Sequence, residues 1–241
     1  MSAADEEEAL RERLRALRAR VEAAARRAGR DPAAVRIVGA AKRQPAARVA
    51  AAVRAGLRDL GENYVQEAIS KQAEIKEILG SDLAGTVRWH GIGHVQTNKA
   101  RAAALAFDRL HTLDSLRLAA ALDREAARAG RVLDALLQVN LSGEPQKSGA
   151  TADALPEIVA GLRGFEHVRA VGLMTMPAPD PEAARPVFAR LRELAGALRA
   201  RAGGEHLVEL SMGMSDDFEV AVEEGATWIR IGTALFGRRE E

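Results

Sequence analysis

Residues 35–42 read VRIVGAAK, a short β-branched run that narrows to small residues and ends on a lysine. Similar runs recur along the chain, separated by Ala- and Leu-rich segments of helical periodicity. Eight can be counted, at residues 35–42, 57–63, 87–94, 109–115, 134–141, 168–176, 207–213 and 228–236. Strands that alternate with helices indicate parallel βαβ units. Eight units in about 200 residues predict an α/β fold, a closed (β/α)8 TIM-type barrel, with an open doubly wound sheet as the alternative.

The segments between the runs carry apolar residues three or four positions apart. One such stripe precedes the first run and consists of Leu10, Leu14, Leu17 and Val21. Acidic residues come before this stripe and arginines after it, which suits the dipole of a helix. Residues 1–30 are therefore predicted to form an N-terminal helix, and residues 183–201 a later one. No linker or repeat divides residues 1–241, which are predicted to be a single domain.

Composition excludes several classes of protein. The 35 Lys and Arg residues nearly balance 34 Asp and Glu, so bulk charge gives no support for nucleic-acid or membrane binding. The absence of cysteine excludes disulfides, thiol catalysis and Cys-ligated metal sites. The first residues contain no apolar segment of the kind found in secretory signals, and no run reaches the roughly 18 residues of a membrane span. We expect a soluble, cytoplasmic protein.

The ends of the eight runs are the informative positions, because barrel enzymes and binding proteins place their sites at the C-terminal ends of the strands. Polar and small residues gather there. They are Lys42, Glu62–Asn63, Gly93–His94, Asp114–Ser115, Asn140, residues 174–176, residues 211–213 and residues 230–233. A ligand pocket needs such residues, although strand ends are polar in any barrel.

The last run, WIRIGTALFG at residues 228–237, places an arginine between two isoleucines. Alternation puts the isoleucines on one face and Arg230 on the other. If the isoleucines pack on the outer helices, Arg230 points into the barrel, where a guanidinium is costly unless paired. Two interpretations stay open: an internal salt bridge to Glu209 or Glu62, or a contact with a ligand.

Gly232 and Thr233 follow directly, and the preceding run ends in SMGMSDD at residues 211–217. Glycine lets the backbone approach a ligand, and hydroxyl and N–H groups bind phosphate oxygens. Barrels commonly bind phosphate after strands seven and eight. Two glycine and hydroxyl pairs at these ends therefore indicate a phosphate site, and a helix start is predicted at residues 215–217.

Lys42 ends the first run after three small residues, which leave space beside it. Most strand-end lysines are surface charges. A lysine with a lowered pKa also forms Schiff bases with aldehydes. Together with an inward arginine and a phosphate site, Lys42 fits either pyridoxal phosphate (PLP) or a phosphorylated-sugar substrate.

Other candidate sites are weaker. His90 and His94 are four residues apart, which in a strand is about 13 Å and too far for one metal ion, so no metal site is predicted. The chain contains no nucleophile-elbow or P-loop motif. The segment 142–149 carries Lys147 and is interpreted either as a gating loop or as a simple turn.

Six motifs resemble one known family. They are GENYVQE (61–67), WHGIGHVQTNK (89–99), NLSGEPQKSG (140–149), GLMTM (172–176), LSMGMSDD (210–217) and RIGTALFG (230–237). They resemble, in order, those of the PLP homeostasis proteins, single-domain relatives of the alanine racemase N-terminal barrel. The resemblance implies a (β/α)8 barrel that carries PLP on Lys42. It also implies that the cofactor-binding residues include Ser211, Gly232 and Thr233 for the phosphate, Arg230 for the ring nitrogen, and Asn63 and Met212 as further pocket positions.

An arginine at the ring nitrogen, here Arg230, limits the reactions that bound PLP would support. Arginine only donates hydrogen bonds, so the ring nitrogen stays unprotonated and the cofactor is a weaker electron sink. Racemases on this barrel use a tyrosine base from a second domain, for which we expect no room after the last run; the only tyrosine is Tyr64.

We therefore predict a protein that carries and buffers PLP as a Schiff base without efficient turnover, with no catalytic residues. An amino-acid racemase and a phosphosugar Schiff-base lyase are the alternatives. Expected partners are PLP and PLP-dependent apo-enzymes, and the expected state is a monomer or weak dimer.

Overall fold

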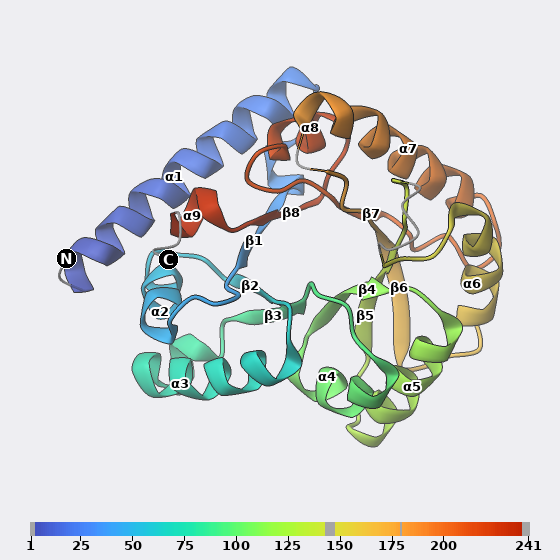
Figure 1. Cartoon of the computed structure of the whole chain (residues 1–241), viewed down its shortest axis with the longest axis horizontal. Coiled ribbons are helices and arrows are strands. Elements are labelled where there is room, and N and C mark those ends of the chain that lie inside the picture. Colours follow the sequence, from blue (N-terminus) through green and yellow to red (C-terminus); the bar gives the residue numbers. More distant parts are fainter. Residues whose placement is uncertain (1–2, 143–147, 179, 238–241) are drawn as a thin grey trace.

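The computed structural model describes residues 3–142, 148–178 and 180–237. Its strands are β1 (Arg36–Ala40), β2 (Asp59–Glu62), β3 (Arg88–Gly91), β4 (Arg109–Leu113), β5 (Leu133–Gln138), β6 (Val168–Met174), β7 (Glu209–Ser211) and β8 (Trp228–Ile231). They are parallel and close into a barrel in chain order, with β8 paired to β1 (Figure 1). The predicted (β/α)8 barrel is confirmed, and the open-sheet alternative is wrong.

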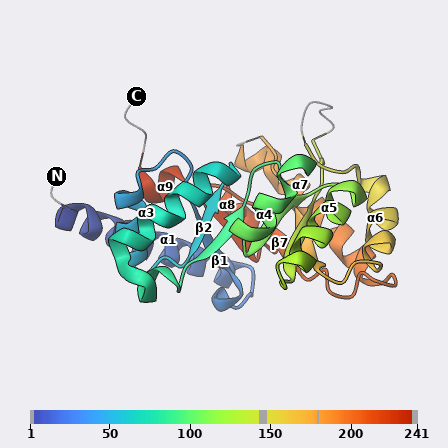
Figure 2. The ribbon, with the colours of Figure 1, turned by 90° about the horizontal axis from the view of Figure 1, so that it is seen from below.

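Helices surround this barrel. They are α1 (Ala3–Arg27), α2 (Ala46–Arg54), α3 (Val65–Ala84), α4 (Ala100–Ala106), α5 (Leu116–Arg128), α6 (Leu155–Leu162), α7 (Pro181–Arg199), α8 (Phe218–Glu223) and α9 (Thr233–Phe236), with 3-10 turns at Pro32–Ala34, Thr97–Lys99 and Ala152–Ala154. Figure 2 shows α3, α4 and α5 side by side along one flank. No helix in the described part of the chain has the length and apolar character needed to cross a membrane.

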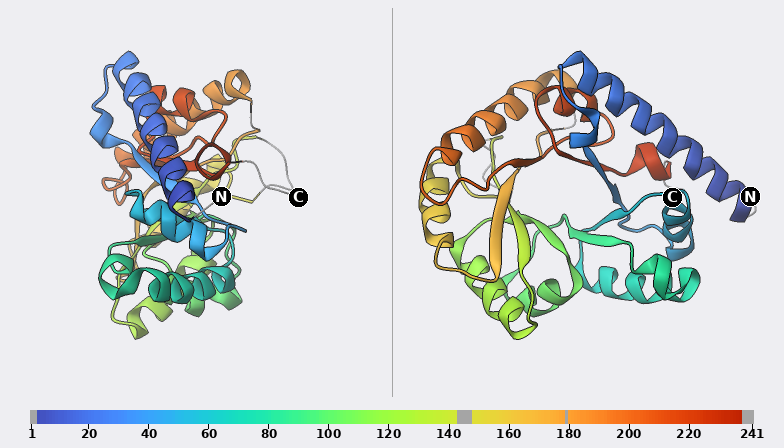
Figure 3. Two further views of the ribbon diagram at one scale, coloured as in Figure 1. Left: turned by 90° about the vertical axis from the view of Figure 1, so that its left-hand side faces the viewer. Right: turned by 180° about the vertical axis from the view of Figure 1, so that it is seen from behind.

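The N-terminal helix packs against helices from the early and the late part of the chain. α1 contacts α2, α8 and α9, and its position along the outside is visible from behind in Figure 3. The predicted apolar stripe, from Leu10 to Val21, is buried. Ion pairs join Arg20 to Glu219 and Arg27 to Glu223, each at 2.8 Å. The helix ends close to the predicted boundary, before Gly29 with its positive φ of 64°.

The strands are shorter at their C-terminal ends than the runs predict. β1 ends at Ala40, and β8 ends at Ile231 because Gly232 leaves the extended conformation, with φ −105° and ψ −85°. The helix predicted to start at residues 215–217 begins at Phe218. The shortened strands leave polar residues in loops around the mouth of the barrel, where backbone and side chains are available to a ligand.

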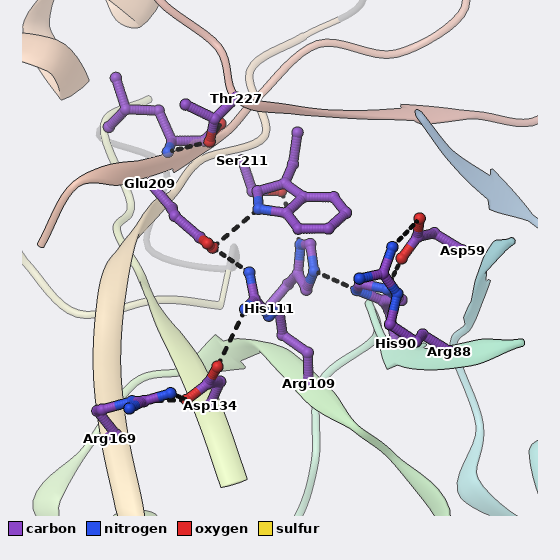
Figure 4. Close-up of polar contacts among 12 residues, drawn as sticks. Asp59, Arg88, His90, Arg109, His111, Asp134, Arg169, Glu209, Ser211 and Thr227 are labelled. Atoms are coloured by element: carbon purple, nitrogen blue, oxygen red, sulfur yellow. Dashed lines mark hydrogen bonds and ion pairs between the residues drawn. The ribbon is translucent and has the colours of Figure 1, made fainter. Parts of the chain in front are cut away.

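The inside of the barrel is polar well beyond the inward-facing Arg230 that the last run predicts. The layer between strands and helices is apolar, with Phe107, Phe188 and Phe218 fully buried. Inside the ring, however, several strands contribute charged or polar side chains that bond to one another across the barrel (Figure 4). They are Asp59, His90, Arg109, His111, Glu209, Ser211 and Arg230.

Candidate cofactor site

A cavity of about 800 Å³ opens at the C-terminal ends of the strands. This volume lies within the range of small-molecule sites, and the position is the one that barrels use for ligands. Residues at or just after each of the eight strands contribute to its wall. The wall residues include Lys42, Asn63, Gly93, His94, Gln138, Thr175, Met214, Ser215, Arg230, Gly232 and Thr233.

The structure brings five of the seven predicted site residues together on this wall: Lys42, Asn63, Arg230, Gly232 and Thr233. Ser211 and Met212 are fully buried and lie behind it. Met212 belongs to the apolar core, while Met214, two residues further on, lines the cavity. Neither residue lies on the cavity wall, and a ligand contact by Ser211 or Met212 stays a prediction.

Lys42 is held through the backbone on both sides of it. The Ala41 carbonyl accepts a hydrogen bond from Lys71 Nζ at 2.7 Å, and the Arg43 N–H donates to Glu67 Oε1 at 2.6 Å. Arg43 has φ 59°, a left-handed conformation that a non-glycine residue adopts only at a cost. These contacts from α3 fix the turn that presents Lys42 to the cavity.

The clamp on this turn is formed by Lys71, Glu67 and Glu62, of which Lys71 and Glu62 are buried. Lys71 is 5% exposed and forms ion pairs with Glu62 and Glu67. Burial raises the pKa of the Glu62 carboxyl, while the hydrogen bond from Lys71 opposes this. Glu62 is thus committed to Lys71, and it is not a partner of the buried arginine.

Arg230 points into the barrel as alternation predicts, and only 5% of it is exposed. Its Nη1 donates to Ser211 Oγ at 2.7 Å and its Nη2 donates to the Thr175 carbonyl at 3.1 Å. The predicted salt bridge to Glu209 or Glu62 is wrong, because Glu209 pairs with Arg109. The remaining N–H groups of the guanidinium have no acceptor among the described residues.

Arg230 stays protonated although it is buried. Burial lowers the pKa of Arg230 to about 10, and the Asp217 carboxylate acts in the opposite direction. The guanidinium is therefore a cation at neutral pH, and Arg230 is one of the residues that line the cavity. An acceptor on a bound molecule would satisfy those donors.

Asn63 reaches the wall because the neighbouring strand end is a glycine. A Cβ on Gly93 would lie 2.4 Å from the Asn63 carbonyl oxygen, too close for any other residue. Both residues line the cavity. Glycine is therefore required at position 93 by the close approach of the Asn63 backbone. The next residue, His94, also lines the cavity.

Gly232 leaves room beside the predicted phosphate position. A Cβ there would meet Ala40 Cβ at 3.7 Å, an ordinary contact, so crowding by the protein does not require glycine. The Thr233 hydroxyl is exposed and has no partner within the described residues. Ser215, interpreted from the sequence as part of a helix start, contributes a wall hydroxyl that accepts from the Ala234 N–H at 3.1 Å.

Of the other residues considered from the sequence, some line the cavity and others lie away from it. His94 lines the cavity with its Nδ1 3.4 Å from Asp114 Oδ2, whereas His90 is buried inside the barrel. Tyr64 is 62% exposed and does not line the cavity. No group of three or more potential metal ligands occurs among the described residues. Lys147 lies outside them.

The wall therefore offers an amine, a cation with spare donors, and hydroxyls beside a glycine. Gln138 also lines the cavity, but its Nε2 donates to the Ser148 carbonyl at 3.0 Å and its Oε1 is buried, so neither atom is counted among the groups offered to a ligand. This donor set fits an anionic molecule that carries a carbonyl group and a ring acceptor. PLP has all three features.

Known proteins with similar sequences point to the same ligand. The family model described as "Alanine racemase, N-terminal domain" matches residues 13–240. The pyridoxal phosphate homeostasis protein of Pseudomonas aeruginosa is 46% identical over 92% of this chain and 92% of its own. The corresponding protein of Escherichia coli K12 is 40% identical over 93% and 94%.

Solved structures agree. PipY of Synechococcus elongatus PCC7942, with PLP bound, is 39% identical with a TM-score of 0.82, over 95% of this chain and all of its own. Alanine racemase of Clostridium difficile 630 has a TM-score of 0.70 at 14% identity, which shows a shared fold alone. The chain therefore belongs to the family of the pyridoxal phosphate homeostasis proteins, built on the barrel of the alanine racemase N-terminal domain.

Proposed function

We propose that this chain binds PLP in the cavity at the strand ends and serves to carry and buffer the cofactor. One observation carries the proposal: Lys42 and Arg230, whose guanidinium has donors without an acceptor among the described residues, line the same cavity. The names of the curated relatives, and the PLP-bound structure of PipY, support the choice of ligand.

Each wall residue has a role in this proposal. PLP supplies an aldehyde, a phosphate and a ring nitrogen when it is bound. The Lys42 amine would provide the covalent attachment, and Arg230 would donate to the ring nitrogen. The hydroxyls of Thr233 and Ser215, next to Gly232, would hold the phosphate. Asn63 would contact the cofactor from the wall between these groups.

The same residues favour holding the cofactor over turnover. Arg230 cannot give a proton to the ring nitrogen and keep its own charge, so the ring withdraws electrons less than it would beside an acid. Tyr64 is not on the cavity wall. A bound cofactor is then retained and protected while reactions at a substrate carbon are disfavoured.

The direct test is an absorbance spectrum of the purified protein before and after borohydride reduction, followed by peptide mass spectrometry. We expect a visible band that borohydride removes and a modified peptide that contains Lys42. Lys42→Ala should lose both signals, whereas Lys76→Ala, on the exposed side of α3, should keep them. A parent protein that stays colourless with excess PLP would contradict the proposal.

A racemase is the second candidate, and one observation favours it. His94 lines the cavity beside Asp114 and is an imidazole that could move a proton. Exchange of the Cα hydrogen of alanine or serine for solvent deuterium at an enzyme-like rate, lost in His94→Asn, would favour this alternative. If borohydride instead traps a sugar phosphate on Lys42 with no PLP bound, the lyase alternative is correct.

Transfer of PLP to apo-enzymes remains a prediction. It is checked by mixing the loaded protein with a PLP-dependent apo-enzyme and following the return of that enzyme's activity. The expected monomer or weak dimer is checked by light scattering across a range of concentrations.

A further inference from the structure

A continuous chain of buried side chains runs from Arg230 across the inside of the barrel. Ser211 Oγ lies 2.8 Å from His111 Nδ1, His111 Nε2 lies 3.0 Å from His90 Nδ1, and His90 Nε2 lies 2.9 Å from Asp59 Oδ1. Each member comes from a different strand (Figure 4). We call Ser211, His111, His90 and Asp59 the interior chain.

The charges along the interior chain are well defined. Burial opposes ionisation of Asp59, but the hydrogen bond from His90 and the charge of Arg88 outweigh it and lower the pKa of this carboxyl. Burial lowers the pKa of His90. The pKa of His111 lies well below its ordinary value, chiefly because of burial, and the guanidinium groups of Arg230 and Arg109 act in the same direction. Both imidazoles are thus neutral at pH 7.

These protonation states give every hydrogen bond one direction. The Asp59 carboxylate only accepts, so His90 Nε2 carries the proton and donates. His90 Nδ1 must then accept, which requires His111 Nε2 to donate and His111 Nδ1 to accept. Ser211 therefore donates its hydroxyl proton to His111 and accepts from Arg230 through its lone pair.

Packing holds the two imidazoles in place. The His90 and Trp228 ring centroids lie 5.0 Å apart, and those of His111 and Trp228 lie 6.1 Å apart. Trp228 Nε1 in turn donates to Glu209 Oε2 at 2.8 Å. The rings cannot rotate without displacing a buried indole that is itself bonded.

We propose that His111 is a positioning residue for Arg230: by accepting the Ser211 hydroxyl proton, it keeps a Ser211 lone pair directed at Nη1 and so fixes the plane of the guanidinium. This role rests on the proposed function only where it concerns the cofactor. Without His111, the Ser211 hydroxyl is free to turn its proton toward Arg230, and the guanidinium loses one of the two acceptors that orient it.

The first test needs no cofactor. Long-range ¹H–¹⁵N NMR of histidine-labelled, cofactor-free protein at pH 7 reports which ring nitrogen of each imidazole carries hydrogen, with His90→Asn and His111→Asn used for assignment. We expect neutral rings protonated at Nε2 for both residues, and a shift of the His111 Nδ1 signal in Ser211→Ala. Protonation of His111 at Nδ1 would overturn the proposal.

The second test compares two ligands: PLP and an analogue with a C–H group in place of the ring nitrogen. In His111→Leu we expect the preference for PLP over the analogue to fall by roughly tenfold, the size of one charge-assisted hydrogen bond. His111→Asn keeps an acceptor near the Nδ1 position and should retain the preference. His167→Leu, at a histidine bonded to the Arg131 carbonyl outside the interior chain, is the control and should also retain it.

The combined variant separates positioning from general damage. In Ser211→Ala the link to Arg230 is already lost, so adding His111→Leu should change the ligand preference no further. Equal loss of affinity for both ligands in His111→Leu would mean a purely structural role and would overturn the proposal. If the parent protein binds neither ligand, the proposed function fails, while the NMR result still decides the hydrogen-bond direction.

Discussion

Lys42 and Arg230 line one cavity from neighbouring strands of the barrel, and their supports differ in kind. The turn of Lys42 is held at its backbone by a helix outside the barrel. Arg230 is held at its guanidinium by side chains and a carbonyl within the barrel. The contacts beside Lys42 fix the backbone that presents its amine, whereas those of Arg230 fix the guanidinium itself.

Loss of the Lys42 clamp should have the largest effect. Lys71→Met leaves the buried Glu62 carboxylate and the Ala41 carbonyl without their donor. Removing one partner of a buried ion pair costs about 3–5 kcal/mol of unfolding free energy. Urea denaturation measures this cost. The double variant Lys71→Met, Glu62→Gln should recover at least half of it, and a single variant as stable as the parent would show that the clamp contributes little.

Removal of the guanidinium should be the next largest effect, and it should fall on binding. Arg230→Leu eliminates a buried donor to the proposed ligand, for which we expect a loss of PLP affinity of about 1.5–3 kcal/mol. Borohydride should still trap PLP on Lys42 at saturating ligand, because the clamp is intact. Absorbance titration measures the affinity. An unchanged affinity would remove Arg230 from the proposed site.

The interior chain should make stability depend on pH. The pKa values of His90 and His111 are lowered, chiefly by burial, so below about pH 6.5 the unfolded chain binds protons that the folded chain does not. Unfolding free energy is then fully present above that pH. It should decrease as the pH falls, by up to about 1.4 kcal/mol per unit for each histidine.

Denaturation at a series of pH values checks this dependence. His111→Asn should reduce the slope of the cofactor-free protein, whereas His167→Asn, outside the interior chain, should leave it unchanged. A parent protein whose stability is flat between about pH 7 and 5 would contradict neutral, buried imidazoles.

Relief of backbone strain beside Lys42 should have the smallest effect. Arg43 has φ 59°, and glycine adopts this conformation without the steric cost of a Cβ. After the entropy of the more flexible unfolded chain is included, Arg43→Gly should stabilise the protein by about 0.5–1 kcal/mol. Thermal denaturation tests this, with Arg43→Asn as an intermediate case. Destabilisation would show that the arginine side chain outweighs the strain.

Much of the fold follows from local pattern. The eight runs all became strands, and the Leu10 to Val21 stripe became the buried face of α1. The alternation of WIRI was enough to predict that Arg230 faces inward. Strand ends were predicted too far along the chain, because small residues such as Ala41 and Gly232 give no sign in the sequence that the backbone has already left the strand.

The site was harder to predict where it depends on distant partners. Ser211 follows the pattern of a wall hydroxyl, and only the closed barrel shows that its hydroxyl contacts His111, 100 residues away. One signal was present: Asp59, His90 and His111 are polar residues in the middle of runs where an apolar barrel interior would have Val, Ile or Leu. Pairing across the ring depends on register and tilt, which periodicity does not contain.

The place of α1 has a consequence for biosynthesis. Its ion pairs with α8 join residues 199 and 196 positions apart, and its neighbour β1 closes the ring only with β8. Contacts between such distant residues form late, because the loop between them must be ordered first. On the ribosome, α1 is made well before α8 and has to wait for it, and the edge of β1 stays open to wrong pairings until β8 is made. We expect truncation within α8 to yield an aggregating chain more readily than an equally short truncation at the start of α1.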